Sequence, residues 1–192
     1  IYGAALGALV VVEKAGDFTF ASNIVGQAYF IANQPNKLAY ALAHMVAYDS
    51  KRNDSPYVTN VDCFGCYICV RISGLAGNTT SGASFGRINC DHGFSGLYVA
   101  GHGAWVHVES MHFKGAPPPA GNTNAILCYD GCLVNVGSLN AENVSGSVVY
   151  AFNELDFSDI TIGVVNAFNC AGATFYAQGN GQITVYGRYT AW

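Results

Sequence analysis

The residues most able to do chemistry at their observed spacing are three cysteines, Cys63-x2-Cys66-x2-Cys69. This spacing is typical of thiolate ligands for zinc or an iron–sulfur cluster, and Cys90 or a nearby histidine would supply the fourth ligand. However, Cys63 and Cys90 occupy the same place in two copies of a repeat, where other copies carry Phe or Ala. Because a free cysteine behaves as a small buried hydrophobe, we interpret these residues as core packing and expect no structural metal and no cofactor. Whether disulfides form is left undecided, since seven cysteines are an odd number in a chain too large to need disulfides.

A second group contains two carboxylates and an imidazole. Asp91, Lys114 and Glu142 occupy one position in successive copies of the repeat, and His112 lies in the neighbouring column. Two carboxylates two coils apart would be separated by about 10 Å, near the upper end of the range for inverting glycosidases. Asp91, Glu142 and His112 are therefore candidate catalytic residues. The alternative is a ladder of alternating charge, in which Lys114 keeps both acids ionised and leaves no general acid.

A third group has the side chains of a sugar-binding surface. Trp105 and His107 alternate with valines, and Asn135 and Arg71 each sit between two apolar residues, so all four are predicted to face outward. An exposed indole can pack on a pyranose ring while neighbouring polar groups bond the hydroxyls. The alternative is that Trp105 is buried in an interface between subunits.

These candidate residues belong to two sets of segments that recur together. Segments of the first set are similar in sequence and begin 27, 23, 28 and 26 residues apart, at Val61, Ile88, Met111, Leu139 and Val165. Segments of the second set alternate apolar and polar residues as half-buried strands do, at Val106–Val108, Val134–Val136, Ile160–Ile162 and Ile183–Val185. Two registers advancing together predict a solenoid in which each coil buries its inward side chains against its neighbours.

Aligned positions then become columns along the solenoid. The anchor residues Val61, Ile88, Met111, Leu139 and Val165 are predicted to form one inward column, and Cys63, Cys90, Phe113, Ala141 and Ala167 to form another. Two polar columns are Asp62, Asn89, His112, Asn140 and Asn166, and Gly65, His92, Gly115, Asn143 and Asn169. Stacked asparagines at turns hydrogen-bond along the axis and satisfy backbone groups there.

The predicted fold is all-β, a right-handed parallel β-helix over residues 56–192. Residues 1–55 are predicted to be a lead-in segment or atypical first rungs, with a short helix suggested by the spacing of Ala39–Tyr48. The Gly- and Pro-rich stretches Gly74–Gly82 and Lys114–Asn124 are expected to be loops that project from the coils. The chain begins at Ile1 and stops at Trp192 inside a strand-like pattern, so we expect it to be part of a longer protein.

The stretch Gly96–Val108, followed by Met111-His-Phe113, resembles rungs of bacteriophage tailspike and tail-fibre β-helices of the pectate-lyase-like class. The resemblance covers roughly residues 56–192 and rests on the style of the rungs. It implies a homotrimer in the virion tail, outside the host cell and in contact with other tail proteins. It further implies binding of a bacterial surface polysaccharide during adsorption. A depolymerase (hydrolase or lyase) on the same scaffold and a structural stalk segment are the alternatives.

The amino-acid composition limits the classes of partner that the chain is expected to bind. Only 10% of the residues are charged, against about 25% in an ordinary soluble domain, and the net charge is −4. The basic residues are scattered singly, so nucleic-acid binding is not expected. No apolar run reaches the length of a membrane span, so membrane insertion is not expected either. A neutral carbohydrate or another protein surface fits better, and a surface this poor in charge favours burial in a trimer.

Overall fold

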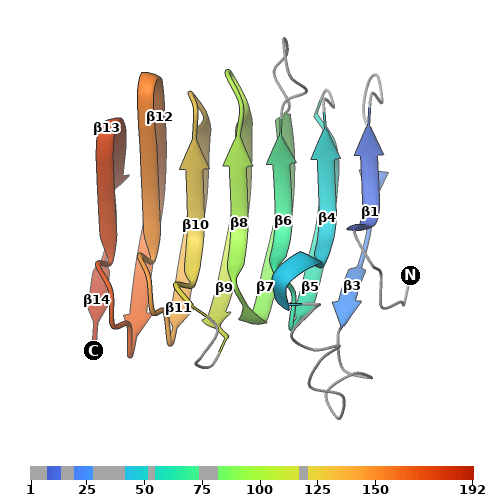
Figure 1. Ribbon diagram of the computed structural model, residues 1–192, viewed down its shortest axis with the longest axis horizontal. Helices are drawn as coiled ribbons and strands as arrows, with labels where there is room; N and C mark the ends of the chain where they lie inside the picture. The colour runs from blue at the N-terminus through green and yellow to red at the C-terminus, as the bar shows by residue number, and fades with distance from the viewer. Residues whose placement is uncertain (1–7, 14–19, 28–41, 52–54, 74–81, 117–120) are drawn as a thin grey trace.

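The described part of the chain folds into stacked coils of β-strand. The structure, a computed structural model, describes residues 8–13, 20–27, 42–51, 55–73, 82–116 and 121–192. Figure 1 shows the strands side by side along one long axis, with the N-terminal strands at one end and the C-terminal strands at the other. The strands are β1 (Ala8–Glu13), β2 (Phe20–Ala21), β3 (Ile24–Gln27), β4 (Val46–Lys51), β5 (Tyr57–Phe64), β6 (Ile68–Ser73), β7 (Gly82–Gly93), β8 (Ser95–Ala100), β9 (Trp105–Gly115), β10 (Asn124–Tyr129), β11 (Leu133–Glu142), β12 (Val149–Phe168), β13 (Phe175–Val185) and β14 (Tyr189–Ala191).

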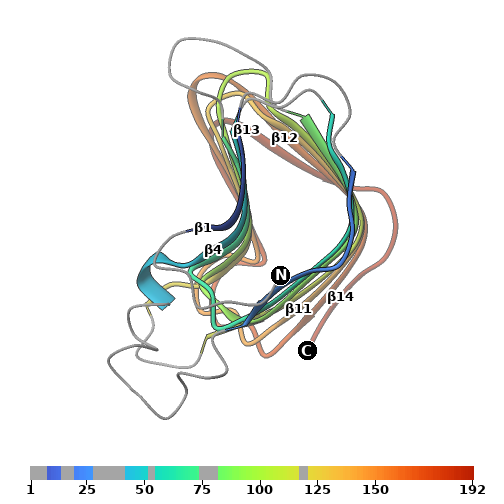
Figure 2. The ribbon, with the colours of Figure 1, turned by 90° about the vertical axis from the view of Figure 1, so that its right-hand side faces the viewer.

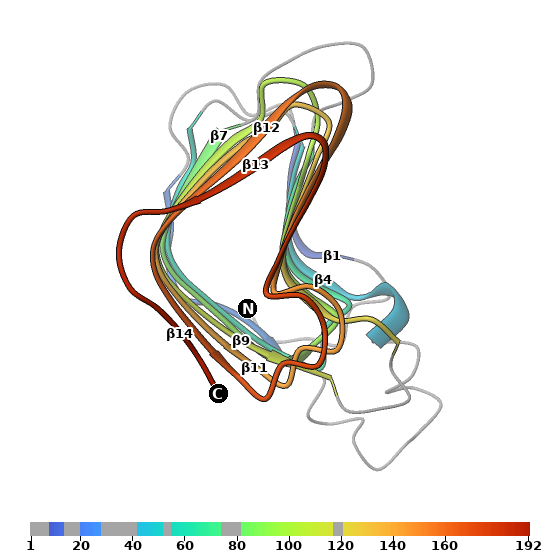
Figure 3. The same ribbon diagram turned by 90° about the vertical axis from the view of Figure 1, so that its left-hand side faces the viewer.

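The coils have three walls, visible end-on in Figures 2 and 3. The first face contains β1, β4, β6, β8, β10 and the beginnings of β12 and β13. The second face contains β2, the beginnings of β5, β7, β9 and β11, residues 158–162 of β12 and the end of β13. The third face contains β3, the ends of β5, β7, β9, β11 and β12, and β14.

Strand pairing is parallel in every pair of the described residues, as the repeat predicts. In Figure 3, which looks from the C-terminal end, the chain approaches the viewer while running anticlockwise, so the coil is right-handed. This is the hand that parallel crossover connections almost always take, because it follows the natural twist of the strands. The prediction of an all-β parallel β-helix is confirmed.

Both predicted inward columns are in register and buried. Val61 pairs with Ile88, and the pairing continues through Met111 and Leu139 to Val165, none of them more than 1% exposed. The column from Cys63 to Ala167 is equally continuous. At least five stacked coils therefore share one apolar core, as predicted.

The predicted asparagine ladders also form. On the third face Asn166 Nδ2 donates to Asn140 Oδ1 at 2.8 Å, and at the following turn Asn169 Nδ2 donates to Asn143 Oδ1 at 2.7 Å. Asn143 and Asn169 have φ values of 53° and 52°, the left-handed region that asparagine tolerates better than most residues. Both ladders link neighbouring coils, and the second does so where the chain must turn.

The corner between the second and third faces depends on glycine, which the repeat did not predict. A Cβ on Gly163 would lie 2.3 Å from the carbonyl oxygen of Gly137 in the preceding coil, and a Cβ on Gly137 would lie 2.5 Å from that of Glu109. Backbones of successive coils approach closely at this corner, so a side chain there requires the coil to move.

The first 55 residues also contribute coils. Strands β1 to β4 lie within them and pair in parallel with one another or with β5 and β6, and residues 42–44 are helical just before β4. The helix expected from Ala39–Tyr48 therefore gives way to β4 within that stretch, and residues 39–41 lie outside the described residues. So do residues 74–81 and 117–120 of the two expected loops. No described helix is long and apolar enough to cross a bilayer.

Candidate functional site

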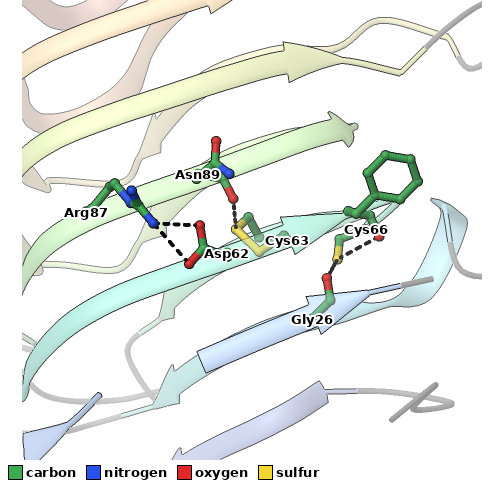
Figure 4. The surroundings of a disulfide bond; sticks show 8 residues. Gly26, Asp62, Cys63, Cys66, Arg87 and Asn89 are labelled. Atoms are coloured by element: carbon green, nitrogen blue, oxygen red, sulfur yellow. Dashed lines mark hydrogen bonds and ion pairs between the residues drawn. A yellow bond between two sulfur atoms is a disulfide. The ribbon is translucent and has the colours of Figure 1, made fainter. Parts of the chain in front are cut away.

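Two of the three closely spaced cysteines are joined to each other. Cys63 and Cys69 form a disulfide inside the core, and Cys66, shown with its neighbours in Figure 4, keeps a free thiol that faces the carbonyl oxygen of Gly26 at 3.7 Å. Within the described residues no group of three or more His, Cys, Asp or Glu side chains is placed to hold a metal ion. The absence of a structural metal stays a prediction, to be checked by metal analysis of purified protein.

The second disulfide and the remaining thiols complete this picture. Cys128 and Cys132 are bonded, and Cys66, Cys90 and Cys170 are free. Burial raises the pKa of Cys66 to about 12 and raises that of Cys90 well above its ordinary value. Since the thiolate is the reactive form, both buried thiols are chemically quiet at neutral pH.

The candidate catalytic residues lie on the outer surface of the third face. Asp91, Lys114 and Glu142 are in register in successive coils, with His112 in the neighbouring column. Asp91 Oδ1 lies 2.7 Å from Nδ1 of His92, whereas Lys114 forms no ion pair with any residue that the structure describes. The expected alignment is present, but Lys114 does not bridge the two acids. Catalysis by Asp91, Glu142 and His112 stays a prediction.

Three of the four candidate binding residues meet on the second face. Trp105, His107 and Asn135 line a shallow depression of about 250 Å³ together with Asp159 and Thr161 of the next coil. Trp105 and His107 point outward, as expected, since the valines between and after them are buried. The indole lies over Gly82 in the preceding coil, where a Cβ would be 2.1 Å from the ring. Trp105 is therefore partly covered, and the missing side chain at Gly82 makes room for it.

Arg71 lies apart from these residues, on the first face. Its guanidinium bonds both carboxylate oxygens of Asp49, with Nε donating to Oδ1 at 2.8 Å. The Asp49 side chain is 1% exposed, and Lys51 Nζ lies 3.8 Å from it. The structure thus shows Arg71 neutralising a buried carboxylate, and it does not bring Arg71 to the depression beside Trp105.

The outer surface of the first face carries a feature that the sequence patterns did not reveal. We call it the aromatic strip, and its side chains come from successive coils: Tyr67, Phe94, Tyr98, Tyr129, Tyr150, Phe152 and Tyr176. The Tyr150 ring is stacked on that of Tyr176 with centroids 5.2 Å apart, and it lies 5.6 Å from that of Tyr129. Tyr129 in turn lies 5.6 Å from Tyr98. In-register aromatic rings on neighbouring strands stabilise the face that carries them.

A groove runs beside the aromatic strip. Two hollows of about 300 and 360 Å³ share Asn122, Asn124, Leu127 and Tyr129, and together they extend from β6 to β13. We call this continuous feature the tyrosine groove. Its aromatic wall is formed by Tyr98, Tyr129, Tyr150 and Tyr176, and its polar wall, at the beginning of the first face, carries Asn122, Asn124, Ser145 and Ser147. Tyr67 and Phe94 lie at the level of the polar wall, because the residues that follow them, Ile68 and Ser95, are in register with Asn124.

The polar wall is held in place by hydrogen bonds. Asn124 Oδ1 accepts a bond from the backbone N–H of Ser147 at 2.9 Å, and the Ser145 hydroxyl donates to the carbonyl oxygen of Gly121 at 2.8 Å. On the aromatic wall, the pKa of Tyr129 is raised to about 12, first by burial and then by the neighbouring phenols of Tyr150 and Tyr98. Burial and the charge of Asp130 also raise the pKa of Tyr98. The phenols therefore keep their protons and offer both donors and acceptors at neutral pH.

One sequence signal, a third register, identifies the first face in retrospect. The first-face strands carry inward residues at Val70, Leu97, Ile126 and Val149, each followed by an outward residue. Arg71, Tyr98, Leu127 and Tyr150 are those outward residues.

Comparison of the chain with protein-family models, with curated proteins and with solved structures finds no match. The assignment of the fold rests on the strand register, and the candidate sites rest on the geometry described above.

Proposed function

We propose that the chain is a polysaccharide-binding β-helix of the phage tailspike or tail-fibre kind, and that it binds the surface glycan of a bacterial host along the tyrosine groove. The observation that carries this proposal is the pairing of an aromatic wall with an amide and hydroxyl wall across successive coils. Sugar rings have apolar C–H faces and hydroxyl-bearing edges, so an extended saccharide meets a complementary surface on each side.

The charge distribution favours a saccharide whose backbone is neutral. The residues that line the tyrosine groove are uncharged at neutral pH. Arg71, a cation on the same face, is engaged by Asp49, and the protein as a whole carries a net charge of −4. A densely anionic polymer would be repelled at long range. Neutral amide and phenol groups, by contrast, bond hydroxyls with little cost in desolvated charge.

In this proposal the chain is one subunit of a homotrimer in the virion tail. The support is the resemblance of its rungs to tailspike coils and a surface in which only 10% of residues are charged. Light scattering of the purified protein should give the mass of three chains. A chain that remains monomeric at all concentrations tested would contradict the trimer and leave glycan binding to be tested separately.

The groove is tested by titrating the protein with a panel of bacterial capsular and cell-wall polysaccharides. Wild-type protein should bind at least one of them, and Tyr129→Ala should weaken that binding about fivefold to tenfold, since an aromatic contact is worth about 1 kcal/mol. Tyr186→Ala is the matched control, because Tyr186 is 77% exposed and does not line the groove. Absence of binding to the whole panel, or equal losses in both variants, would show the proposal to be wrong.

A further inference from the structure

A second groove lies at the turn that leads from the third face to the first. We call it the turn groove; its volume is about 560 Å³ and its polar lining comes from His92, Lys114, Asn122, Asn143, Ser145 and Asn169. Asn122 and Ser145 also line the tyrosine groove, so the two grooves meet around the turn. A ligand held along the aromatic strip therefore has a polar recess beside it.

The asparagine ladder ends inside the turn groove with an unused donor. Asn169 donates its amide hydrogen to Asn143 Oδ1, so the Asn143 amide nitrogen is not used in the bond to the following coil. In the preceding coil the column continues with Gly115, which has no side chain to accept a hydrogen bond. A Cβ on Gly115 would lie 2.3 Å from the carbonyl oxygen of Asn143, so glycine is required at this position. The Asn143 amide N–H group has no acceptor among the described residues.

A cation faces the same recess. Lys114 lines the turn groove from the coil of Gly115 and forms no ion pair with the described residues. The other charged groups nearby are Glu142, in register with Lys114, and Asp91, which is paired with His92. Neither acid lines the groove. Lys114 and Asn143 thus line one recess, and no carboxylate of the described residues lines it.

We propose that the turn groove binds the carboxylate of an acidic sugar, a uronic acid unit of the polysaccharide. This inference rests on the proposed function, and it adds that the largely neutral glycan carries a singly charged substituent. A carboxylate accepts from Lys114 and Asn143 in charge-assisted hydrogen bonds. A monoanion suits this recess better than a phosphate dianion, because Glu142 and Asp91 repel the larger charge more strongly.

The test is an NMR titration that follows the side-chain amide signals of Asn143 in wild-type protein. Glucuronate should shift these signals, whereas glucose, its uncharged counterpart, and inorganic phosphate should shift them much less at equal concentration. Lys114→Gln should weaken glucuronate binding more than tenfold, since it removes a hydrogen bond to a charged group. Glu142→Gln should strengthen binding about threefold, since it removes a nearby like charge. Arg87→Gln is the matched control, because Arg87 lies on the same face but pairs with Asp62.

The outcomes separate this inference from the proposed function. Equal shifts with glucose and glucuronate, stronger binding of phosphate, or no shift at all would overturn the carboxylate site. Equal effects of Lys114→Gln and Arg87→Gln would overturn it as well. In Tyr129→Ala, glucuronate should still bind the turn groove. If glucuronate binds while no polysaccharide binds the tyrosine groove, the proposed function fails and the carboxylate site stands.

Discussion

The thiols of Cys66 and Cys90 lie in the core beside the disulfide that joins Cys63 to Cys69. The sequence identified these positions as core, because Cys63 and Cys90 align with apolar residues of other coils. It did not reveal the bond to Cys69, since that bond joins Cys63 on the third face to Cys69 on the first face, which the repeat did not align. The repeat therefore identified Cys63 as a core position but did not identify its disulfide partner.

Thiol reactivity should follow burial. Iodoacetamide at pH 7.5 should modify the half-buried Cys170 in the native protein and leave Cys66 and Cys90 unmodified until denaturant is added, because both are buried whereas Cys170 is partly exposed. Mass spectrometry of the digested protein measures the labelled positions. Rapid native labelling of Cys90 would show that the core at this coil is open.

Trp105 should contribute to stability through its contact with Gly82. Trp105→Ala removes a partly buried indole and should lower the free energy of unfolding by about 1–2 kcal/mol. Gly82→Ala should displace the ring, because a Cβ there would lie 2.1 Å from it. The double variant should then cost less than the sum of the single variants, which urea unfolding measures. Strict additivity would mean that the two residues do not share this contact. Unchanged stability in Trp105→Ala would leave the residue free for ligand binding alone.

At the scale of the strands, the repeat predicted the third face well and the other two less well. The inward anchors and the asparagine ladders could be read because those segments keep one offset within each coil. The aligned inward residues of the first face, Val70, Leu97 and Ile126, lie 9 residues after Val61 and after Ile88 but 15 residues after Met111, since the chain between β9 and β10 contains extra residues. This change in offset hid the aromatic strip. The glycines at the corner were not recognised as a repeat, because the same position carries Thr59 and Glu109 in other coils.

The glycine corner should be sensitive to a single methyl group. Gly163→Ala places a Cβ 2.3 Å from the carbonyl oxygen of Gly137, so the coil must shift, and we expect a loss of about 1–3 kcal/mol in unfolding free energy. Glu109→Ala is the control, because that position in the same column already carries a side chain and its change should stay within about 0.5 kcal/mol. If Gly163→Ala is as stable as wild type, the coils do not approach as closely as the structure shows.

At the scale of the whole molecule, buried phenols and thiols set the response to alkaline pH. Burial raises the pKa of Tyr48 and of Tyr129 from 10.0 to about 12, and that of Cys66 from 9.0 to about 12. These groups ionise more readily in the unfolded chain, so their contribution to stability is complete below about pH 9 and is lost as pH rises toward 12. Urea unfolding between pH 8 and 12 measures this loss, and Tyr129→Phe should reduce its slope. Stability that is constant or increasing over this range would contradict the buried positions of these groups.

The shape of the molecule supports the proposal that a chain so poor in charge binds a long ligand. Stacked coils place equivalent side chains at strand spacing, about 4.8 Å apart, so one outward position becomes a strip that an extended polymer can follow. Three walls offer three such surfaces, and in this protein one is aromatic, one carries the Trp105 depression and one carries the acids. We propose that the polysaccharide follows the aromatic wall.

Intermolecular NOEs between a bound oligosaccharide and the protein side chains would locate the ligand on the surface. The oligosaccharide is prepared from whichever polysaccharide binds in the titration. Cross-peaks should connect its ring protons to the aromatic protons of Tyr129 and Tyr150. Cross-peaks to Trp105 without any to these tyrosines would place the ligand on the second face and contradict binding in the tyrosine groove.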